Sequence, residues 1–242
     1  MKPETVEGGD CAPLPGGSEV LRSTGHADTR YRVHHSPWAL FLKRCMDLCL
    51  AILLLLVLSP VLTLVALIIR LDSAGPAFYR QTRIGTRRRP FSMWKFRTMA
   101  RDAPEGPHRD FVLALMRGSE PTRPAAKLVD DPRITRVGRW LRRTSFDELP
   151  QLFNVVRGEM SLIGPRPPVL YEYEAYQPWQ LERFEMPQGM TGLWQVSGRN
   201  RLTYRRMHEL DIEYVRRWSL WLDVRILVAT LRAVVVDGEP IG

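Results

Sequence analysis

The chain has 242 residues, a length that suits one domain with appendages or two small domains. Its 35 Lys and Arg against 26 Asp and Glu give a formal net charge of +9, which favours anionic partners such as nucleic acid, phospholipid headgroups or phosphorylated small molecules. The 3 cysteines form no CxxC pair and do not suggest a disulfide framework, and the histidines lack the spacing of zinc ligands.

The N-terminal part of the chain changes abruptly from polar to apolar. Residues 1–36 combine Gly, Pro, Ser, Thr and charge without an apolar period, which predicts a disordered cytosolic tail. Residues 48–69 read LCLAILLLLVLSPVLTLVALII and carry no charge. As a helix, roughly 22 residues rise about 33 Å, enough to cross the hydrocarbon core of a bilayer, so one transmembrane helix is the simplest prediction.

Two features of this segment favour a re-entrant hairpin over a single span. Ser59 and Pro60 stand in its middle, and a proline inside a helix removes a hydrogen bond and kinks the helix. Both flanks are basic, with Lys43 and Arg44 before the segment and several arginines after it, whereas the positive-inside rule wants only one basic end. We therefore expect residues 37–72 to enter and leave the membrane by the cytoplasmic face, with the single span as the competing hypothesis.

Local patterns predict the elements that follow. Residues 77–97 are typical of a β-hairpin with Gly85 near its turn, and residues 102–126, rich in Pro and Gly, of a loop with a short helix. Residues 209–236 are mostly helical in pattern, either buried or lying at the membrane interface. One further helix face is predicted from apolar residues at i, i+3, i+4 and i+7, which are Leu149, Leu152, Phe153 and Val156. Together these elements predict a mainly helical α+β fold.

An adjacent acid pair, Asp147 and Glu148, stands among arginines. These are Arg139, Arg142, Arg143, Arg157 and Arg166. A structural interpretation is a capping box, because Ser145 and Glu148 match the S-x-x-E pattern of a helix start. Pro150 complicates it, since proline prefers the first helical position and therefore predicts a regular helix that begins at about residue 150, with the acid pair just before it.

The charges around the acid pair point to chemistry on phosphate. Nearby arginines lower the pKa of a carboxyl group by favouring its charged form. An ionised carboxylate beside guanidinium groups suits nucleophilic attack on phosphorus, while the arginines hold phosphoryl oxygens bidentately. The second carboxylate can hold Mg²⁺, which is often bound by one or two carboxylates plus substrate phosphates. Spacing alone leaves both the catalytic and the capping interpretation open.

Four stretches of the chain, in this order, resemble the bacterial monotopic phosphoglycosyl transferases, also called polyprenyl-phosphate sugar-phosphate transferases. They are KRCMDLCLAILLLLVLSPV, RIGTRRRPFSMWKFRTM, DDPRITRVGRWLRRTSFDELPQLFNVVRGEMSLIGPRP and TGLWQVSGRN, and the resemblance runs from about residue 43 to 236. It implies a compact membrane enzyme that moves a hexose 1-phosphate from a UDP-sugar to undecaprenyl phosphate and releases UMP. The implied setting is the cytoplasmic face of the bacterial inner membrane, at the first membrane step of exopolysaccharide, O-antigen or capsule synthesis.

The resemblance also implies roles for particular residues. Asp147 corresponds to the family's nucleophile, which forms an aspartyl-phosphosugar intermediate, and Glu148 to a Mg²⁺ ligand. Ser59 and Pro60 match the break that makes the family's membrane helix re-entrant. The substrate-binding candidates that match charged positions of the family's active region are Lys95, Arg142, Arg166, Arg199 and Asp211. The implied domains are the tail over 1–36, a membrane hairpin over 37–72 and a cytosolic catalytic domain over 73–242.

The chain departs from the family at one place, and two alternative functions compete. Before TGLWQ the family has a basic residue and then Pro-Gly, whereas this chain has MPQGM, which puts the local loop geometry in question. UDP-glucose or UDP-galactose is the favoured donor, while N-acetylated donors and the oligomeric state stay open. The competing functions are a non-catalytic scaffold for glycan assembly and a membrane-tethered nucleic-acid-binding protein. Because no nucleic-acid-binding motif is found, the expected partners are a UDP-sugar, undecaprenyl phosphate and membrane lipids, without nucleic acid.

Overall fold

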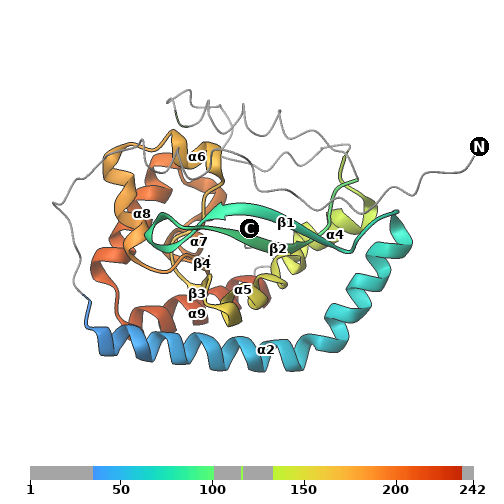
Figure 1. Ribbon diagram of the computed structural model, residues 1–242, viewed down its shortest axis with the longest axis horizontal. Coiled ribbons are helices and arrows are strands. Elements are labelled where there is room, and N and C mark those ends of the chain that lie inside the picture. The colour runs from blue at the N-terminus through green and yellow to red at the C-terminus, as the bar shows by residue number, and fades with distance from the viewer. Residues whose placement is uncertain (1–34, 101–115, 117–132, 236–242) are drawn as a thin grey trace, which may run out of the picture. The chain divides into compact units, whose positions relative to one another are not determined.

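The computed structural model describes residues 35–100, 116 and 133–235 (Figure 1). Within them, helices and two two-stranded sheets confirm the predicted mainly helical α+β fold. In chain order the elements are α2 (Pro37–Asp72), β1 (Phe78–Ile84), η1 (Thr86–Arg88), β2 (Pro90–Phe96), α4 (Arg136–Thr144), η2 (Phe146–Glu148), α5 (Gln151–Arg157), β3 (Ser161–Ile163), α6 (Leu170–Glu174), η3 (Pro178–Glu185), β4 (Gly189–Thr191), α7 (Leu193–Val196), η4 (Arg199–Arg201), α8 (Tyr204–Arg217) and α9 (Leu220–Val235). The predicted tail over 1–36 and loop over 102–126 lie almost wholly outside the described residues.

Helix α2 is the one helix in the described part of the chain that is long and apolar enough to cross a membrane, judged by length and composition. It is a continuous helix, so the predicted break at Ser59 and Pro60 is a bend, which Figure 1 shows between the blue and cyan parts of α2. Pro60 has no N–H to donate to the Leu56 carbonyl, and the Ser59 hydroxyl donates to it instead at 2.8 Å. The hydroxyl of Thr63 donates to the Ser59 carbonyl at 2.8 Å. These hydroxyl groups satisfy the carbonyls at the bend, and the helix continues through it.

The first third of α2 is bound to the domain that follows it through polar side chains. Lys43, 1% exposed, donates to the Ile163 carbonyl of β3 at 3.0 Å. Asp47 accepts from the Leu162 N–H of the same strand at 3.1 Å. The Arg44 guanidinium donates to two carbonyls at the end of α5, those of residues 155 and 156, at 2.6 and 2.9 Å. Ionic side chains on this part of an otherwise apolar helix therefore serve to dock it on β3 and α5.

The C-terminal end of α2 is bound to the same domain. Arg97, which follows β2 and is 8% exposed, donates to the carbonyls of Ile69, Ser73 and Ala74 at 3.4, 2.7 and 2.9 Å. These are carbonyls at and just beyond the helix end, which lack partners inside the helix. A cation there is also favoured by the helix dipole. Both ends of α2 are thus fixed to one set of elements.

The predicted hairpin over 77–97 is confirmed. Strands β1 and β2 pair antiparallel from Phe78 opposite Phe96 to Ile84 opposite Pro90, and the Gly85 N–H donates to the Arg89 carbonyl at 2.7 Å. A second sheet pairs β3 with β4 in parallel. A β-carbon on the glycine of β4, Gly189, would lie 2.1 Å from the backbone nitrogen of residue 164, so this close approach requires glycine.

One helix prediction is confirmed by α5, and a second needs correction. Helix α5 buries Leu152, but Phe153 is 42% exposed, because Asn154 occupies the inner side and binds β2 through the Trp94 N–H at 2.9 Å. The predicted helical stretch over 209–236 is two helices, α8 and α9, separated at Trp218, whose ψ of 136° ends the first. Asp223 and other residues of α9 are buried while its Trp221 is 69% exposed, so α9 is neither wholly buried nor wholly exposed.

Candidate active site

The acid pair lies in η2, a single 3-10 turn between α4 and α5. Helix α4 ends at Ser145, whose φ of 59° turns the chain, and its side chain makes no capping hydrogen bond. The proposed capping box is therefore absent. The regular helix α5 begins at Gln151 with Pro150 as its N-cap, which confirms the alternative prediction of a helix start at about residue 150. Asp147 and Glu148 are consequently presented by a short turn rather than by a long helix.

Helix α4 is held so that this turn lies against β2. The Thr135 hydroxyl caps α4 by accepting from the Gly138 N–H at 2.9 Å. A β-carbon on Gly138 would lie 2.0 Å from the Thr98 carbonyl oxygen, so only glycine permits this approach to the chain just after β2. The Thr135 N–H donates to that same carbonyl at 3.1 Å. The candidate Arg142 extends this contact, since its Nε donates to the Thr98 hydroxyl at 2.9 Å.

Lys95 and Glu148 form the central ion pair of the site. Lys95 Nζ on β2 lies 2.7 Å from Glu148 Oε1, and both side chains are partly accessible, at 18% and 16%. Asp147, at 8% exposed, is more buried than its neighbour. The two adjacent carboxyl groups therefore have different surroundings.

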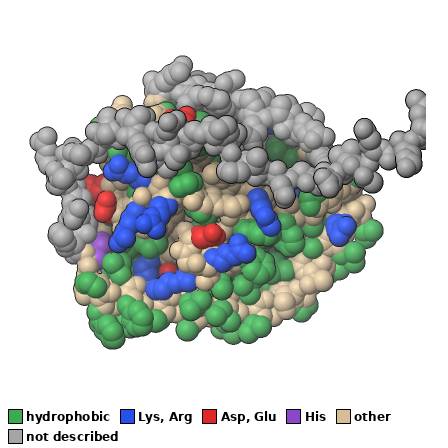
Figure 2. All heavy atoms as spheres, in the orientation of Figure 1, with side chains coloured by type: hydrophobic (Ala, Val, Ile, Leu, Met, Phe, Trp, Pro, Cys, Tyr) green, Lys and Arg blue, Asp and Glu red, His purple; other side chains and the backbone are tan. Residues whose placement is uncertain are grey.

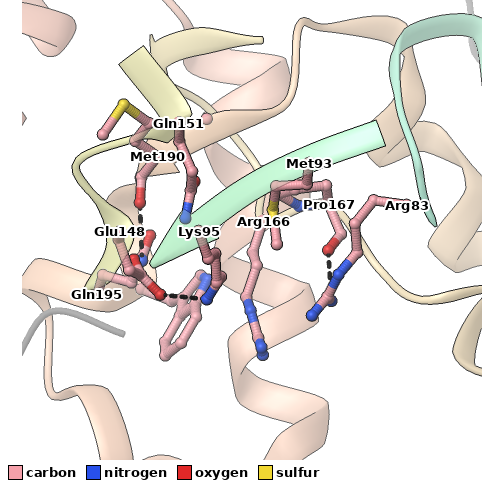
Figure 3. A pocket seen from close by; sticks show the side chains of 11 residues that line it. Arg83, Met93, Lys95, Glu148, Gln151, Arg166, Pro167, Met190 and Gln195 are labelled. Carbon is pink, nitrogen blue, oxygen red and sulfur yellow. Dashed lines mark hydrogen bonds and ion pairs between the residues drawn. The ribbon is translucent and has the colours of Figure 1, made fainter. Parts of the chain in front are cut away.

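Lys95 and Glu148 line an open pocket together with two arginines (Figure 3). Arg166 comes from the loop after β3, and its side chain is exposed. Arg83, 6% exposed, comes from β1 and donates to the Pro167 carbonyl at 3.0 Å. Figure 3 shows the side chains of Lys95, Arg166 and Arg83 extending in the same direction. Burial, followed by repulsion from Arg166, lowers the pKa of Arg83 to about 10, which leaves it charged at neutral pH.

The remaining candidates lie around the pocket rather than in its lining. Arg199, at 8% exposed, has a φ of 50°, and its Nε donates to the carbonyl of the pocket residue Gln195 at 2.8 Å. Asp211, at 1% exposed, accepts from Arg183 on η3. Burial raises the pKa of Asp211 above its usual value, and the nearby cations Arg183 and Arg166 oppose this rise. Pocket-lining candidates are thus Lys95, Glu148 and Arg166.

Several pocket residues were missed by the sequence analysis. Arg83 had been noted only as one of many arginines after the apolar segment, and no local pattern separates it from them. The remaining missed residues of the lining are Met93, Gln151, Pro167, Gly189, Met190, Trp194 and Gln195. Four of them belong to the stretch that spans β4 and α7. Its first part is the MPQGM segment that departs from the family pattern, and its second part is the TGLWQ motif. Their place in the lining depends on the parallel pairing of β3 with β4, which joins distant parts of the chain.

The surface around the site combines charge with apolar groups. In Figure 2, Lys and Arg side chains surround an acidic group on this face, and hydrophobic side chains follow the edge where Figure 1 places α2. The described residues contain no cluster of three or more His, Cys, Asp or Glu that could hold a metal ion. Mg²⁺ needs no such cluster, because one or two carboxylates plus substrate phosphates and water complete its shell. The oxygen donors of Asp147 and Glu148 fit that requirement.

An acid pair thus lies beside three cations, on a domain that is fixed to one long apolar helix. A model of the bacterial sugar transferase family matches residues 38–237, and the chain belongs to this family.

Characterised relatives agree with this assignment. The galactosyl transferase CpsE of Streptococcus agalactiae is 43% identical over 198 residues, which cover 81% of this chain and 43% of the relative. The undecaprenyl-phosphate glucose phosphotransferase of Komagataeibacter xylinus is 44% identical over 209 residues, covering 81% of this chain and 36% of the relative. The exopolysaccharide production protein ExoY of Sinorhizobium fredii is 42% identical over 192 residues, covering 79% and 84%. The chain thus spans less than half the length of the first two relatives and most of the third.

Proposed function

We propose that this protein transfers a hexose 1-phosphate from a UDP-sugar to undecaprenyl phosphate and releases UMP. The observation that carries the proposal is the pocket in which the cations Arg83, Lys95 and Arg166 meet Glu148, next to Asp147 in the same turn. Both substrates carry phosphate, which arginine binds bidentately. Family membership and the apolar helix α2 support a lipid-linked acceptor.

The proposed reaction has two displacements at one phosphorus atom. A carboxylate oxygen of Asp147 attacks the β-phosphorus of the UDP-sugar, the bond from this phosphorus to the bridging oxygen breaks, and UMP leaves with that oxygen. A phosphate oxygen of undecaprenyl phosphate then attacks the aspartyl-bound phosphorus. The Asp147 carboxylate is released and undecaprenyl-diphosphate sugar is formed. Arg166 and Arg83 stabilise the negative charge on the phosphoryl oxygens during both steps.

Glu148, with Asp147 beside it, is the proposed ligand for Mg²⁺. When bound, the ion neutralises charge on the phosphate oxygens and orients the leaving group. In the structure Glu148 pairs with Lys95, so the same carboxylate stands between a lysine and the proposed ion site. Lys95 orients the Glu148 carboxylate in this arrangement through the ion pair at 2.7 Å.

The donor is proposed to be UDP-glucose or UDP-galactose. The support comes from relatives named as an undecaprenyl-phosphate glucose phosphotransferase and, in Salmonella typhimurium, an undecaprenyl-phosphate galactose phosphotransferase. The second of these is 42% identical over 200 residues. The similarity to the exopolysaccharide production protein ExoY supports a role in exopolysaccharide synthesis.

The test is UMP release by purified protein in nanodiscs with undecaprenyl phosphate, Mg²⁺ and a panel of UDP-sugars. Asp147→Asn should abolish UMP release, and mass spectrometry of wild-type protein incubated with donor alone should find a phosphohexose on Asp147. Glu213→Gln, an acid-to-amide change on an outer face of α8, is the matched control and should retain full activity. Activity retained by Asp147→Asn would refute the covalent route, and a silent wild type with intact glycan synthesis in cells would favour the scaffold.

The topology proposed for α2 is re-entrant, with the catalytic domain on the cytoplasmic face of the inner membrane. The support is that Lys43 near one end and the Ile69 and Ser73 carbonyls at the other are bound by one domain. A helix that spans the bilayer would put these ends about a membrane thickness apart on opposite sides. In a cysteine-free background, Ser36→Cys and Ser92→Cys should both react with an impermeant maleimide only in inverted vesicles. Labelling of the two positions from opposite sides would establish a single span.

A further inference from the structure

The loop that carries Arg166 to the pocket has its backbone bound on both sides of this residue. The Gly189 N–H of β4 donates to the Pro165 carbonyl at 2.8 Å. The Ile84 N–H at the end of β1 donates to the Pro168 carbonyl at 3.0 Å. Backbone amides of two different sheets therefore hold the two ends of this short stretch.

The two carbonyls between these ends accept from buried arginine side chains. Arg83 donates to the Pro167 carbonyl at 3.0 Å, and Arg183 donates from Nη2 to the Arg166 carbonyl at 2.8 Å. Four successive carbonyls are thus bound, and three of the four residues are prolines, whose φ is fixed. Arg166 is the one residue of this stretch that is not proline.

Arg183 differs from Arg83 because it does not line the pocket. It lies on η3 at 3% exposed, and its Nη1 donates to the Tyr176 hydroxyl at 2.6 Å. Its Nη2 also donates to Asp211 Oδ2 of α8. One N–H group of this nitrogen therefore donates to a carboxylate and the other to the Arg166 backbone carbonyl. Gln188 donates to the Arg183 carbonyl at 2.9 Å, which fixes the residue from its backbone as well.

We propose that Arg183 and Asp211 are positioning residues, which hold the backbone of Arg166 and thereby aim its guanidinium group into the pocket. The inference rests on the proposed role of Arg166 in phosphate binding. Under this proposal Asp211 does not contact the substrate. It acts through Arg183, because Asp211 is buried and Arg183 donates to the loop backbone.

The charges explain why the pair is needed. A lone buried guanidinium loses its hydration without compensation, and a carbonyl or hydroxyl acceptor replaces only part of it. Asp211 supplies the counter-charge that keeps Arg183 buried beside the Arg166 carbonyl. Arg183 can therefore bind a backbone carbonyl close to a pocket where Arg166, Arg83 and Lys95 already concentrate positive charge.

A double-mutant cycle in nanodiscs tests the proposal. Asp211→Asn, nearly isosteric, and Arg183→Met should each lower kcat/KM for UMP release by about 10- to 100-fold, since small misplacements of a binding group cost up to about that much. In an Arg166→Ala background the same two changes should lower kcat/KM by less than about threefold, because their target is already absent. Equal losses with and without Arg166 would overturn the proposal.

The matched control lies on the same two elements. Arg216 of α8 donates to Glu182 of η3 at 2.8 and 2.7 Å, but the arginine side chain is 53% exposed. Arg216→Met removes a link between α8 and η3, and should leave kcat/KM within about twofold of wild type, because neither residue of this pair lines the pocket.

Hydrogen exchange separates this inference from the proposed function. If Arg183 and Asp211 hold the loop, Asp211→Asn should speed exchange of the Gly189 and Ile84 amides, whose acceptors are loop carbonyls. Faster exchange in a protein without transferase activity would support the positioning role and defeat the proposed reaction. Unchanged exchange at both amides, in a folded Asp211→Asn protein, would defeat the positioning role whatever the activity.

Discussion

Replacing Asp223 by alanine should weaken the attachment of the first third of α2 to the domain that follows it. Asp223, at 0% exposed, accepts from Lys43 Nζ at 2.7 Å, from the Tyr214 hydroxyl at 2.7 Å and from Trp218 Nε1 at 3.0 Å. Lys43 has one other acid nearby, Asp47, whose Oδ2 is 3.8 Å away. The carboxylate of Asp223 is therefore the shared acceptor of three donors from α2, α8 and the turn before α9.

The magnitude follows from what the alanine leaves behind. Removing one partner of a buried ion pair costs about 3–5 kcal/mol, because the other charge stays buried. Each donor left without an acceptor, on Tyr214 and Trp218, adds about 1–3 kcal/mol if water does not reach it. The sum, at least about 5 kcal/mol, is comparable to the whole stability of many domains, about 5–15 kcal/mol.

The assay measures the free energy of unfolding in detergent micelles for the two single variants, Asp223→Ala and Lys43→Met, and for the double variant. The double variant should be about 2–4 kcal/mol more stable than the sum of the single losses predicts, because the second change removes the stranded charge. Glu213→Ala is the control, since its partner Arg217 is 76% exposed and such pairs contribute about 0.3–0.5 kcal/mol. An Asp223→Ala protein as stable as this control would refute the reasoning.

Three further predictions follow from local geometry. Gly189→Ala should lower the melting temperature by several degrees or prevent folding, because the new methyl group would meet the Gly164 nitrogen at 2.1 Å. Thermal unfolding measures the change in melting temperature, with Ser197→Ala as an exposed control. Lys95→Met should lower kcat about 10²-fold. The free energy of unfolding should change by about 1 kcal/mol or less, because the ion pair of Lys95 with Glu148 is partly exposed. A large loss of stability would contradict this prediction. Burial, then repulsion from Arg183, lowers the pKa of His208 to about 3. Below about pH 6.5 the unfolded chain therefore binds a proton at this histidine that the folded chain does not bind. The free energy of unfolding consequently falls as the pH falls. His208→Gln should remove up to about one proton from this pH dependence between pH 6.5 and 4, measured by unfolding at several pH values, and an unchanged slope would contradict it.

The parts of the fold that the sequence predicted are those set by local signals. A run of apolar residues without charge marks α2, and an alternating segment around Gly85 marks the hairpin. The start of α5 followed from Pro150, because the missing N–H of proline restricts where a helix can begin. The division of 209–236 into two helices left no such signal, since Trp218 and the serine after it are compatible with a helix.

The candidate site was predictable only where charge is concentrated in one stretch. Asp147 and Glu148 were prominent because they are adjacent and surrounded by arginines. Arg83 was not, because its role depends on tertiary pairing of the β1 end with the loop after β3. The apolar period placed Phe153 on one helix face with Leu152, but it could not show that a buried amide, Asn154, takes the inner side by binding β2.

Strand β3 connects the long apolar helix α2 to the proposed phosphate site. Lys43 and Asp47 of α2 bind its backbone at residues 162 and 163, and the chain reaches Arg166 three residues later. Gly164, which lies between residues 163 and 166, can approach Gly189 of β4 only because neither residue has a side chain. A shift of α2 would therefore move the loop backbone directly. This argues that, under the proposed function, α2 would fix the height of the pocket relative to the membrane surface, where the polyprenyl phosphate would meet the sugar nucleotide.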